Sequence, residues 1–505
     1  MLPSSHIFYT YCSPLLGILL ALAFAPFNFG YLAVIALSVL FWSWEHVSAS
    51  KAALRGYLFG LGLFGFGVSW VYVSVHDFGK ASVIGAGLLT AFFVGFWALF
   101  PALVGYLAVK ARFGSRTVLN ILIVPLLWIL VENLRGYWFL NGFPWLQIAY
   151  AQIDTPLSGY IPVVGVYGTG FLVALSAALM VFALKSHHKA AVLMAVLAVI
   201  WLGGAILKTV SWTHAIGPAF QVSLIQGNIR QDQKWLPNNK IKTLVKYKLL
   251  TEQHWDSNVI IWPESSIPAY LSEVDAFFLT PLEAAVKQHN IDLIVSLPLE
   301  DTDSDAIYNG VLSLGKERMT YKKNHLLPFG EFLPLQPLSG FVLELLGIKL
   351  GSFTPGGAKQ TFLNAGGYAF STSICYEDAF GGEVINGIEK AAFLVNVTND
   401  AWFGHSIEPY QHLQIARLRA LETGRYLLRA TNTGVTAIVD AGGNIVKQAP
   451  LFETAVVTAK VIPMGGMTPY ARVGDTFIMG VLTVLMLGLL WLKFKGLPLP
   501  WSRGG

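Results

Sequence analysis

Three side chains that could perform covalent chemistry each lie where a short predicted strand ends. Glu264 follows residues 258–262 and Pro263, Lys323 precedes a second polar turn, and Cys375 follows residues 368–374. A carboxylate beside a thiol can accept its proton, and an ammonium group can stabilise the oxyanion of an acyl transfer. Taken singly, such residues are more often a solvated charge or a small buried hydrophobe. The prediction of a nucleophile at Cys375 therefore depends on the three side chains meeting.

The composition indicates a protein that crosses a membrane several times. Hydrophobic residues make up 54% of the 505 positions and charged residues only 12%, against about a quarter charged in soluble domains. Several apolar windows reach the roughly 20 residues that a membrane helix needs. Residues 1–11 contain no Lys or Arg, so the first apolar stretch is expected to remain as a helix and not to be cleaved as a signal peptide.

We predict about eight membrane helices with a long polar insert before the last one. The helices are expected at residues 9–25, 31–46, 54–74, 82–108, 117–131, 161–184, 189–207 and 474–492. The chain is accordingly divided into helices one to seven (1–209), a catalytic insert (210–468), and the last helix with its tail (469–505).

The loops between these stretches differ in their positive charge. One set of loops carries ten Lys and Arg residues: Lys51, Arg55, Lys110, Arg112, Arg116, Lys185, Lys189, Lys493, Lys495 and Arg503. The opposite set offers only Lys80, Arg135 and Lys208. Because positive loops stay in the cytoplasm, both termini are predicted there, and the insert is predicted to face the periplasm or the cell exterior.

The insert has the pattern of an α/β domain. Continuous apolar runs predict buried strands at 221–226, 258–262, 292–297 and 392–397, and apolar residues at helical spacing predict helices at 274–289 and 409–424. The turn at 440–444 joins two short runs as a hairpin. Alternating strands and helices favour a layered fold.

Other classes of site have little support in the sequence. Cys12 and Cys375 are the two cysteines, which is too few for a disulfide framework. No zinc-like spacing, glycine-rich phosphate loop or basic nucleic-acid surface is present. We therefore expect no metal, no cofactor and no nucleic-acid partner.

The predicted outer loop at 132–145 combines many aromatic side chains with polar ones. Trp145 and its neighbours fit an aromatic belt at the membrane interface. With Arg135 and Asn141, Trp145 equally fits a surface that contacts a lipid headgroup or another substrate. Both interpretations remain open at this stage.

The motifs around the three reactive residues carry a family resemblance. They are Trp262-Pro263-Glu264, Tyr321-x-Lys323-x-His325-Leu326 with Pro328-Phe329-Gly330-Glu331, Cys375-Tyr376-Glu377, and residues 399–404. Together they resemble the nitrilase superfamily, in which a Glu-Lys-Cys triad lies on an αββα sandwich. With the flanking helices, the chain as a whole is similar to the bacterial apolipoprotein N-acyltransferases.

The resemblance implies a role for each matching residue. Glu264 corresponds to the general base, Lys323 to the cation that stabilises the oxyanion, and Cys375 to the nucleophile. Lys323 is chosen over Lys322 because it fits the motif and shares one face with Tyr321 and His325. Supporting roles fall to Glu331, Tyr376 and Glu377. Substrate contacts fall to Trp235 and Trp402, for which packing is the alternative.

The resemblance also implies the reaction. The acyl donor would be a membrane phospholipid, typically phosphatidylethanolamine, and the acceptor the free amine of a diacylglyceryl-cysteine on an apolipoprotein. Transfer would be ping-pong through a thioester on Cys375, in a monomeric enzyme. The alternatives are a membrane-anchored amidase that hydrolyses a small amide, and a scaffold that binds lipid or lipoprotein without catalysis. The apolar segment at 335–350 is either a membrane-dipping arm or a buried core helix.

Overall fold

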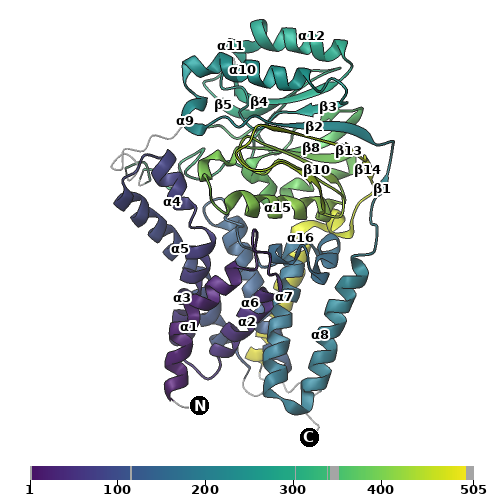
Figure 1. The fold of residues 1–505 in the computed structure, drawn as a ribbon. Helices are drawn as coiled ribbons and strands as arrows, with labels where there is room; N and C mark the ends of the chain where they lie inside the picture. The colour runs from purple at the N-terminus through teal and green to yellow at the C-terminus, as the bar shows by residue number, and fades with distance from the viewer. Residues whose placement is uncertain (1–2, 114–116, 302, 338, 342–351, 496–505) are drawn as a thin grey trace. The chain divides into compact units, whose positions relative to one another are not determined.

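The computed structural model describes residues 3–113, 117–301, 303–337, 339–341 and 352–495 (Figure 1). The chain forms two compact units. Unit 1 comprises residues 1–69, 90–210 and 473–505, and unit 2 comprises 70–89 and 211–472. Most of the segment at 335–350, for which an arm or a core helix was predicted, lies outside the described residues.

Unit 1 is built from helices that coincide with the predicted membrane spans. Their bounds are α1 Pro3–Ala21, α2 Tyr31–Ser43, α3 Ala49–Gly67, α5 Val83–Ala111, α6 Thr117–Asn133, α7 Ile161–Lys185, α8 His187–Leu207 and α16 Pro469–Phe494. Among the described residues, five helices are long and apolar enough to cross a membrane, or six if α3 and the bent segment after it form one span. Apolar helices Phe8–Ala21 and Tyr31–Ser43 are shorter. The count of about eight crossings therefore stays a prediction.

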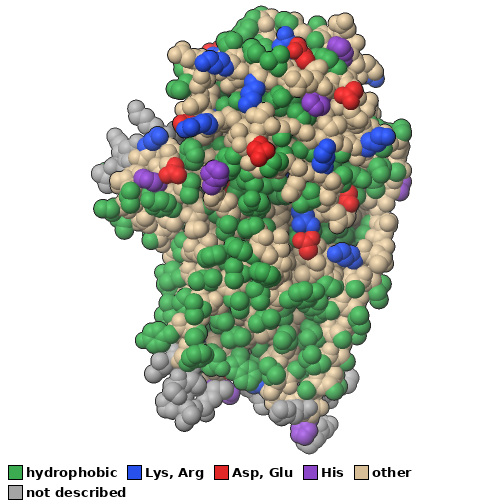
Figure 2. Space-filling model, in the orientation of Figure 1, with side chains coloured by type: hydrophobic (Ala, Val, Ile, Leu, Met, Phe, Trp, Pro, Cys, Tyr) green, Lys and Arg blue, Asp and Glu red, His purple; other side chains and the backbone are tan. Residues whose placement is uncertain are grey.

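The outward faces of these helices are apolar, which is the reverse of a water-soluble helix. Leu88 and Phe92 on α5 and Val192 and Val199 on α8 are among the large exposed hydrophobic side chains. Figure 2 shows hydrophobic side chains covering the helices of unit 1 on the face in view, with few charged groups among them. A helix that is apolar all round requires an apolar surrounding, so the chain is a membrane-embedded protein.

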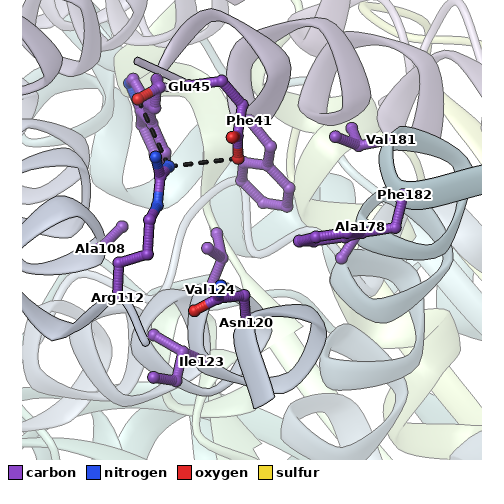
Figure 3. A pocket seen from close by; sticks show the side chains of 11 residues that line it. Phe41, Glu45, Ala108, Arg112, Asn120, Ile123, Val124, Ala178, Val181 and Phe182 are labelled. Carbon is purple, nitrogen blue, oxygen red and sulfur yellow. Dashed lines mark hydrogen bonds and ion pairs between the residues drawn. The ribbon is translucent and has the colours of Figure 1, made fainter. Parts of the chain in front are cut away.

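Charged side chains of unit 1 meet at one end of its helices. Glu45, just after α2, lies 3.1 Å from Arg112 and 2.6 Å from Lys185, beside a pocket whose lining residues come from α2, α5, α6 and α7 (Figure 3). Arg112 and Lys185 belong to the loops that the charge pattern assigns to one side of the membrane. Arg55 does not lie in a loop as the sequence suggested, because it is buried inside α3 and bonds to the carbonyl of Ser43.

Unit 2 contains two six-stranded sheets. The first has the order β13-β2-β3-β4-β5-β6 and the second the order β12-β11-β10-β9-β8-β7. Bounds in the first sheet are β2 Phe220–Gln226, β3 Val259–Ile261, β4 Asp292–Glu300, β5 Ile307–Leu314, β6 Met319–Lys322 and β13 Ala455–Val461. Bounds in the second are β7 Leu363–Ala365, β8 Tyr368–Ile374, β9 Phe393–Thr398, β10 Tyr426–Thr431, β11 Ala437–Val439 and β12 Ile445–Gln448. A short pair, β1 His214–Ala215 and β14 Met464–Gly465, stands apart from both sheets.

Helices cover the outer face of each sheet. The first sheet carries α10 Pro237–Glu252, α11 Leu271–Val274 and α12 Thr280–Gln288, and the second carries α15 Glu408–Thr423 (Figure 1). Two short helices, α9 Gln231–Lys234 and α14 Gly381–Val384, lie in connecting segments. The four layers confirm the predicted αββα sandwich.

Side-chain alternation along the strands builds three apolar layers. Ile261 of β3 and Val395 of β9 belong to the core between the sheets. Ile260 turns to the opposite face and packs in the core that includes residues of α10 and α12, whereas Leu394 packs in the core that includes residues of α15. Successive residues of a strand point to opposite faces, so strands buried on both sides read as the continuous apolar runs seen in the sequence.

One segment between the helices groups with the two sheets. Residues 70–89 are part of unit 2. Trp70 packs edge-on against Phe403 at 4.9 Å and donates from its indole nitrogen to Gln411 at 3.1 Å. Phe78 packs edge-on against Trp402 at 5.9 Å. These contacts, which are distant in sequence, explain why the segment groups with residues 400–411.

Candidate active site

Cys375 stands where β8 ends and a 3₁₀ turn, Cys375–Ala379, begins. Its φ is +51°, a left-handed conformation that is uncommon for a residue with a side chain. The turn is held from within, because the Glu377 carboxylate accepts the backbone N–H of Ile374 at 2.7 Å. The amide of Asn396 on β9 donates to the carbonyl of Cys375 at 3.3 Å. The backbone around the sulfur is thus fixed by side chains on both sides.

Glu264 lies beyond the end of β3 and is buried. Its carboxylate accepts the side-chain amide of Asn309 at 2.7 Å, and its carbonyl accepts the ammonium group of Lys234 at 3.1 Å. The next residue, Ser265, has a φ of +47° and donates its N–H to the hydroxyl of Ser296 at 3.0 Å. The turn that follows Pro263 therefore directs the carboxylate inward.

Lys323 follows the last residue of β6 and is only 1% exposed. Its ammonium group donates to both oxygens of Glu331, at 2.9 and 2.8 Å. The neighbouring Lys322 points elsewhere, with its ammonium group 3.9 Å from the centre of the Tyr308 ring. The two adjacent lysines therefore have different surroundings, and Lys323 is the one in the buried site.

Asn309 on β5 connects these groups, although the motifs gave no sign of it. Its side-chain amide donates to Glu264 at 2.7 Å and to Glu331 at 3.1 Å. Its backbone carbonyl accepts the backbone N–H of Lys323 at 2.8 Å. Lys234, which approaches Glu264 from α9, was missed as well. An asparagine in a mostly apolar strand was the one available signal, because buried amides are kept where they have partners.

The charges of the three reactive residues act on one another. Burial lowers the pKa of Lys323, but Glu331, Cys375 and Glu264 raise it more, so the ammonium form is favoured. Burial also raises the pKa of Glu264, against the opposing effect of Lys323. For Cys375, burial and the charge of Glu264 raise the pKa to about 12, while Lys323 lowers it. At neutral pH the thiol is protonated beside a carboxylate with increased proton affinity and a fixed cation.

This arrangement can perform nucleophilic acyl transfer. A carboxylate whose pKa is raised by burial is a better proton acceptor than a solvated one. An ammonium group held in place by a second carboxylate can stabilise an oxyanion without reorganising. Glu264 and Lys323 are buried, and Cys375, which is partly buried, lies close enough for both charges to act on its thiol.

The predicted supporting residues lie around this site. Glu377 accepts the N–H groups of Asn324 and His325, at 2.7 and 3.1 Å, and the hydroxyl of Tyr321 at 3.0 Å. Burial nevertheless raises the pKa of Glu377 to about 7. Tyr376 is buried and packs edge-on against His325 and Phe380. Both residues brace the turn Cys375–Ala379 against the segment that follows Lys323.

The aromatic residues predicted to contact substrate are partly open to the surroundings. Trp402 is 42% exposed in the turn Asp400–Phe403, and Trp235 is 50% exposed directly after α9. Trp235 follows Lys234, the residue that bonds to the carbonyl of Glu264. Exposed tryptophans near a reactive centre are suited to an apolar ligand, and their substrate role stays a prediction.

Arg135 and Trp145 belong to unit 1 and are both buried. The guanidinium of Arg135 donates to the carbonyls of Phe143 and Trp145, at 2.6 and 2.7 Å. These bonds stabilise the loop after α6, and the structure gives no support for a headgroup contact at either residue. Their substrate role stays a prediction from the sequence.

Comparison with known proteins finds two family models along the chain. Residues 16–179 match the apolipoprotein N-acyltransferase N-terminal domain, and residues 221–470 match the carbon-nitrogen hydrolase domain. The chain is 51% identical to the apolipoprotein N-acyltransferase of Methylococcus capsulatus over 91% of each chain. It is 40% identical to that of Nitrosomonas europaea, over 95% of this chain and 97% of the relative.

Proposed function

We propose, because the chain belongs to the apolipoprotein N-acyltransferase family, that it transfers a fatty acyl chain from a membrane phospholipid to the N-terminal amine of a diacylglyceryl-cysteine on apolipoproteins. The observation that carries the mechanism is that Asn309 links the buried carboxylate of Glu264 to Glu331, which holds the ammonium group of Lys323, and that both charges act on the Cys375 thiol. A membrane-embedded chain suits two substrates that both reside in the bilayer.

The first half-reaction loads the enzyme. Glu264 takes the proton of the Cys375 thiol, and the thiolate attacks the ester carbonyl of the phospholipid. The oxyanion that forms is stabilised by Lys323. The C–O bond to the glycerol then breaks, and the departing alkoxide takes the proton from Glu264. The products are an acyl-thioester on Cys375 and a lysophospholipid.

The second half-reaction passes the acyl chain on. The amine of the acceptor attacks the thioester carbonyl, and Lys323 again stabilises the oxyanion. Glu264 accepts a proton from the amine, the C–S bond breaks, and the thiol is restored with that proton. The product is an amide-linked acyl chain, and both half-reactions use the same base and cation.

The finer features of this proposal have separate support. The donor is proposed to be phosphatidylethanolamine, as the family resemblance implies. The charged end of unit 1, where Glu45, Arg112 and Lys185 meet, is proposed to face the cytoplasm because positive loops are retained there. Both termini would then be cytoplasmic and the catalytic domain periplasmic at the inner membrane. The enzyme is proposed to act as a monomer.

The decisive experiment tests whether the acyl chain becomes attached to the sulfur of Cys375. The full-length protein is incubated with labelled phospholipid, and the peptide that contains Cys375 is analysed by mass spectrometry. A long-chain adduct that hydroxylamine removes is expected in the wild type, and it should be absent from Cys375→Ala. Cys12→Ala, which removes the other cysteine, is the matched control and should keep the adduct.

Two other results would change the assignment. Turnover of soluble small amides without any acyl adduct would indicate a membrane-anchored amidase. Absence of both adduct and turnover would indicate a scaffold that binds lipid or lipoprotein.

A further inference from the structure

A second group of buried charges lies behind the nucleophile turn. His412 on α15 approaches a carboxylate with each ring nitrogen, since Nε2 lies 3.0 Å from Asp378 and Nδ1 lies 3.0 Å from Asp400. Arg429 on β10 also contacts both carboxylates, at 3.2 and 3.1 Å. All four side chains are at most 2% exposed. We call this group of four the rear network.

The geometry requires a doubly protonated His412. A neutral imidazole carries one N–H and can donate to only one partner, whereas an imidazolium donates from both nitrogens. The guanidinium of Arg429 donates to the carboxylates of both Asp378 and Asp400. Two carboxylates therefore face two cations, and each ring nitrogen of His412 has an acceptor.

The two carboxylates belong to two different functional turns. Asp378 is part of the turn Cys375–Ala379, which begins with the nucleophile. Asp400 begins the turn Asp400–Phe403, which carries Trp402. A rigid imidazolium between them fixes the distance between the two turns.

The network also reaches the backbone of the nucleophile. Arg429 donates to the side-chain carbonyl of Asn396 at 2.5 Å, and the amide of Asn396 donates to the carbonyl of Cys375 at 3.3 Å. A change in the rear network is therefore transmitted to Cys375 along two paths, one through Asp378 and one through Asn396.

We propose that His412 is a positioning residue for the acyl transfer: its imidazolium fastens the turn that carries Cys375 to the turn that carries Trp402. The proposal rests on the proposed function, because it takes Cys375 as the nucleophile. It assigns His412 no contact with substrate. Its effect comes through the position and the electrostatic surroundings of the sulfur.

The charges around His412 keep the imidazolium stable at neutral pH. Burial and Arg429 lower its pKa, but Asp378 and Asp400 raise it further, to well above the ordinary histidine value. Glu408, on the same helix, lies 3.5 Å from Nδ1 and is the remaining carboxylate that faces the ring. Burial and Glu264 raise the pKa of the Cys375 thiol, whereas Lys323 and His412 lower it. Loss of the imidazolium should therefore make the thiolate harder to form.

A bound metal is a poorer explanation of the same cluster. Asp400, Glu408 and His412 bring possible ligand atoms within 4.8 Å of one another. Arg429, however, already places its guanidinium 3.1 Å from Asp400. A metal ion there would have to compete with that guanidinium, and His412 would have to give up a proton.

The test uses His412→Gln and the double variant His412→Gln/Asp378→Asn in the full-length protein in phospholipid nanodiscs. The first measurement is the rate of adduct formation on Cys375 with labelled phospholipid. The second is the pH dependence of Cys375 alkylation by iodoacetamide, and the third is thermal stability. His289→Gln is the matched control, because His289 is exposed and stacks on Trp255.

We expect His412→Gln to slow adduct formation about 100-fold, the scale of a small misplacement of reacting groups. The midpoint of Cys375 alkylation should move to higher pH, which a merely structural residue would not cause. The double variant removes one negative and one positive charge, so it should regain thermal stability without regaining the rate. His289→Gln should match the wild type in all three measurements.

The proposal is overturned if His412→Gln is folded and forms the adduct at the wild-type rate. It is also overturned if the double variant regains rate and stability together, because His412 would then act through charge balance alone. If the single variant does not fold, the double variant decides by the same criterion. If the wild type forms no adduct, the proposed function is wrong. The pH midpoint of Cys375 alkylation in His412→Gln would then be the measurement that supports or overturns the role of His412.

Discussion

Cys375 lies between two buried charge networks that differ in their balance. The front network contains the carboxylates of Glu264 and Glu331 with the ammonium group of Lys323 and the amide of Asn309. The rear network opposes the carboxylates of Asp378 and Asp400 to two cations. In front, the ammonium group of Lys323 is held by Glu331, and that of Lys234 lies at the backbone carbonyl of Glu264. Behind, Asp378 and Asp400 each contact both cations.

The difference in balance suits two different tasks. In front, burial raises the pKa of Glu264, and Lys323, Asn309 and Lys234 oppose this rise without cancelling it. Behind, burial also raises the pKa of Asp400, but Arg429 and His412 lower it to below its ordinary value. An unbalanced buried network supplies a group that exchanges protons, while a balanced one holds its charges and fixes geometry.

The largest expected effect comes from removing the proton acceptor of the front network. Glu264→Gln keeps the shape and loses the base, so formation of the Cys375 adduct should slow by about 1000-fold. The rate is measured by mass spectrometry with labelled phospholipid. Glu283→Gln, in a surface ion pair with Arg318, is the control and should keep the rate. A wild-type rate in Glu264→Gln would exclude Glu264 as the base.

The next effect tests the cation of the same network. Lys323→Met should raise the activation free energy of the same step by about 3 kcal/mol, the value of one oxyanion donor. Lys322→Met is the matched control, because its ammonium group lies over the Tyr308 ring, and its rate should change by about twofold or less. Equal losses in both variants would show that positive charge in general, and not the bound ammonium, is needed.

Breaking the rear network should mainly lower the free energy of unfolding. Asp400→Asn leaves two buried cations facing one carboxylate, and we expect a loss of about 3 kcal/mol in unfolding free energy. The pKa of Asp400 is lowered in the fold, so its contribution is present above its unfolded pKa and is lost as pH falls through the folded value. The difference in Tm from the wild type should therefore shrink in acid. A constant difference at all pH values would contradict an ionic role.

The smallest effect concerns the amide that links the front carboxylates. Asn309→Ala removes hydrogen bonds to Glu264 and Glu331, and adduct formation should slow about 10-fold. The bond from Asn309 lowers the pKa of Glu264, so without it the acid limb of the pH–rate profile should move to higher pH. That profile is measured on single-turnover adduct formation. An unmoved acid limb would separate Asn309 from the ionisation of Glu264.

The sequence predicted those features that are local or periodic. Continuous apolar runs identified β2, β3, β4 and β9, and the motif around Lys323 distinguished it from Lys322. The apolar runs arise because a strand that is buried on both faces contains few polar residues. The motif arises because a side chain at a strand end needs its sequence neighbours in a fixed order.

The rest depends on contacts between distant residues. Asn309, Lys234 and His412 have ordinary sequence surroundings, and their partners lie 45, 30 and 34 positions away in the bonds described above. Arg55 looked like a loop residue until the fold placed it inside α3. No periodicity or motif encodes such pairings, since they are properties of the packed layers.

The docking of residues 70–89 onto unit 2 has a consequence for how the enzyme is made. Trp70 and Phe78 leave the ribosome long before Phe403 and Trp402, which they contact. The catalytic domain thus cannot acquire its full cover from its own stretch of chain, and an excised fragment of residues 211–472 would expose those aromatic faces to water. Residues 70–78 are therefore needed to complete the packing around Trp402 and Phe403.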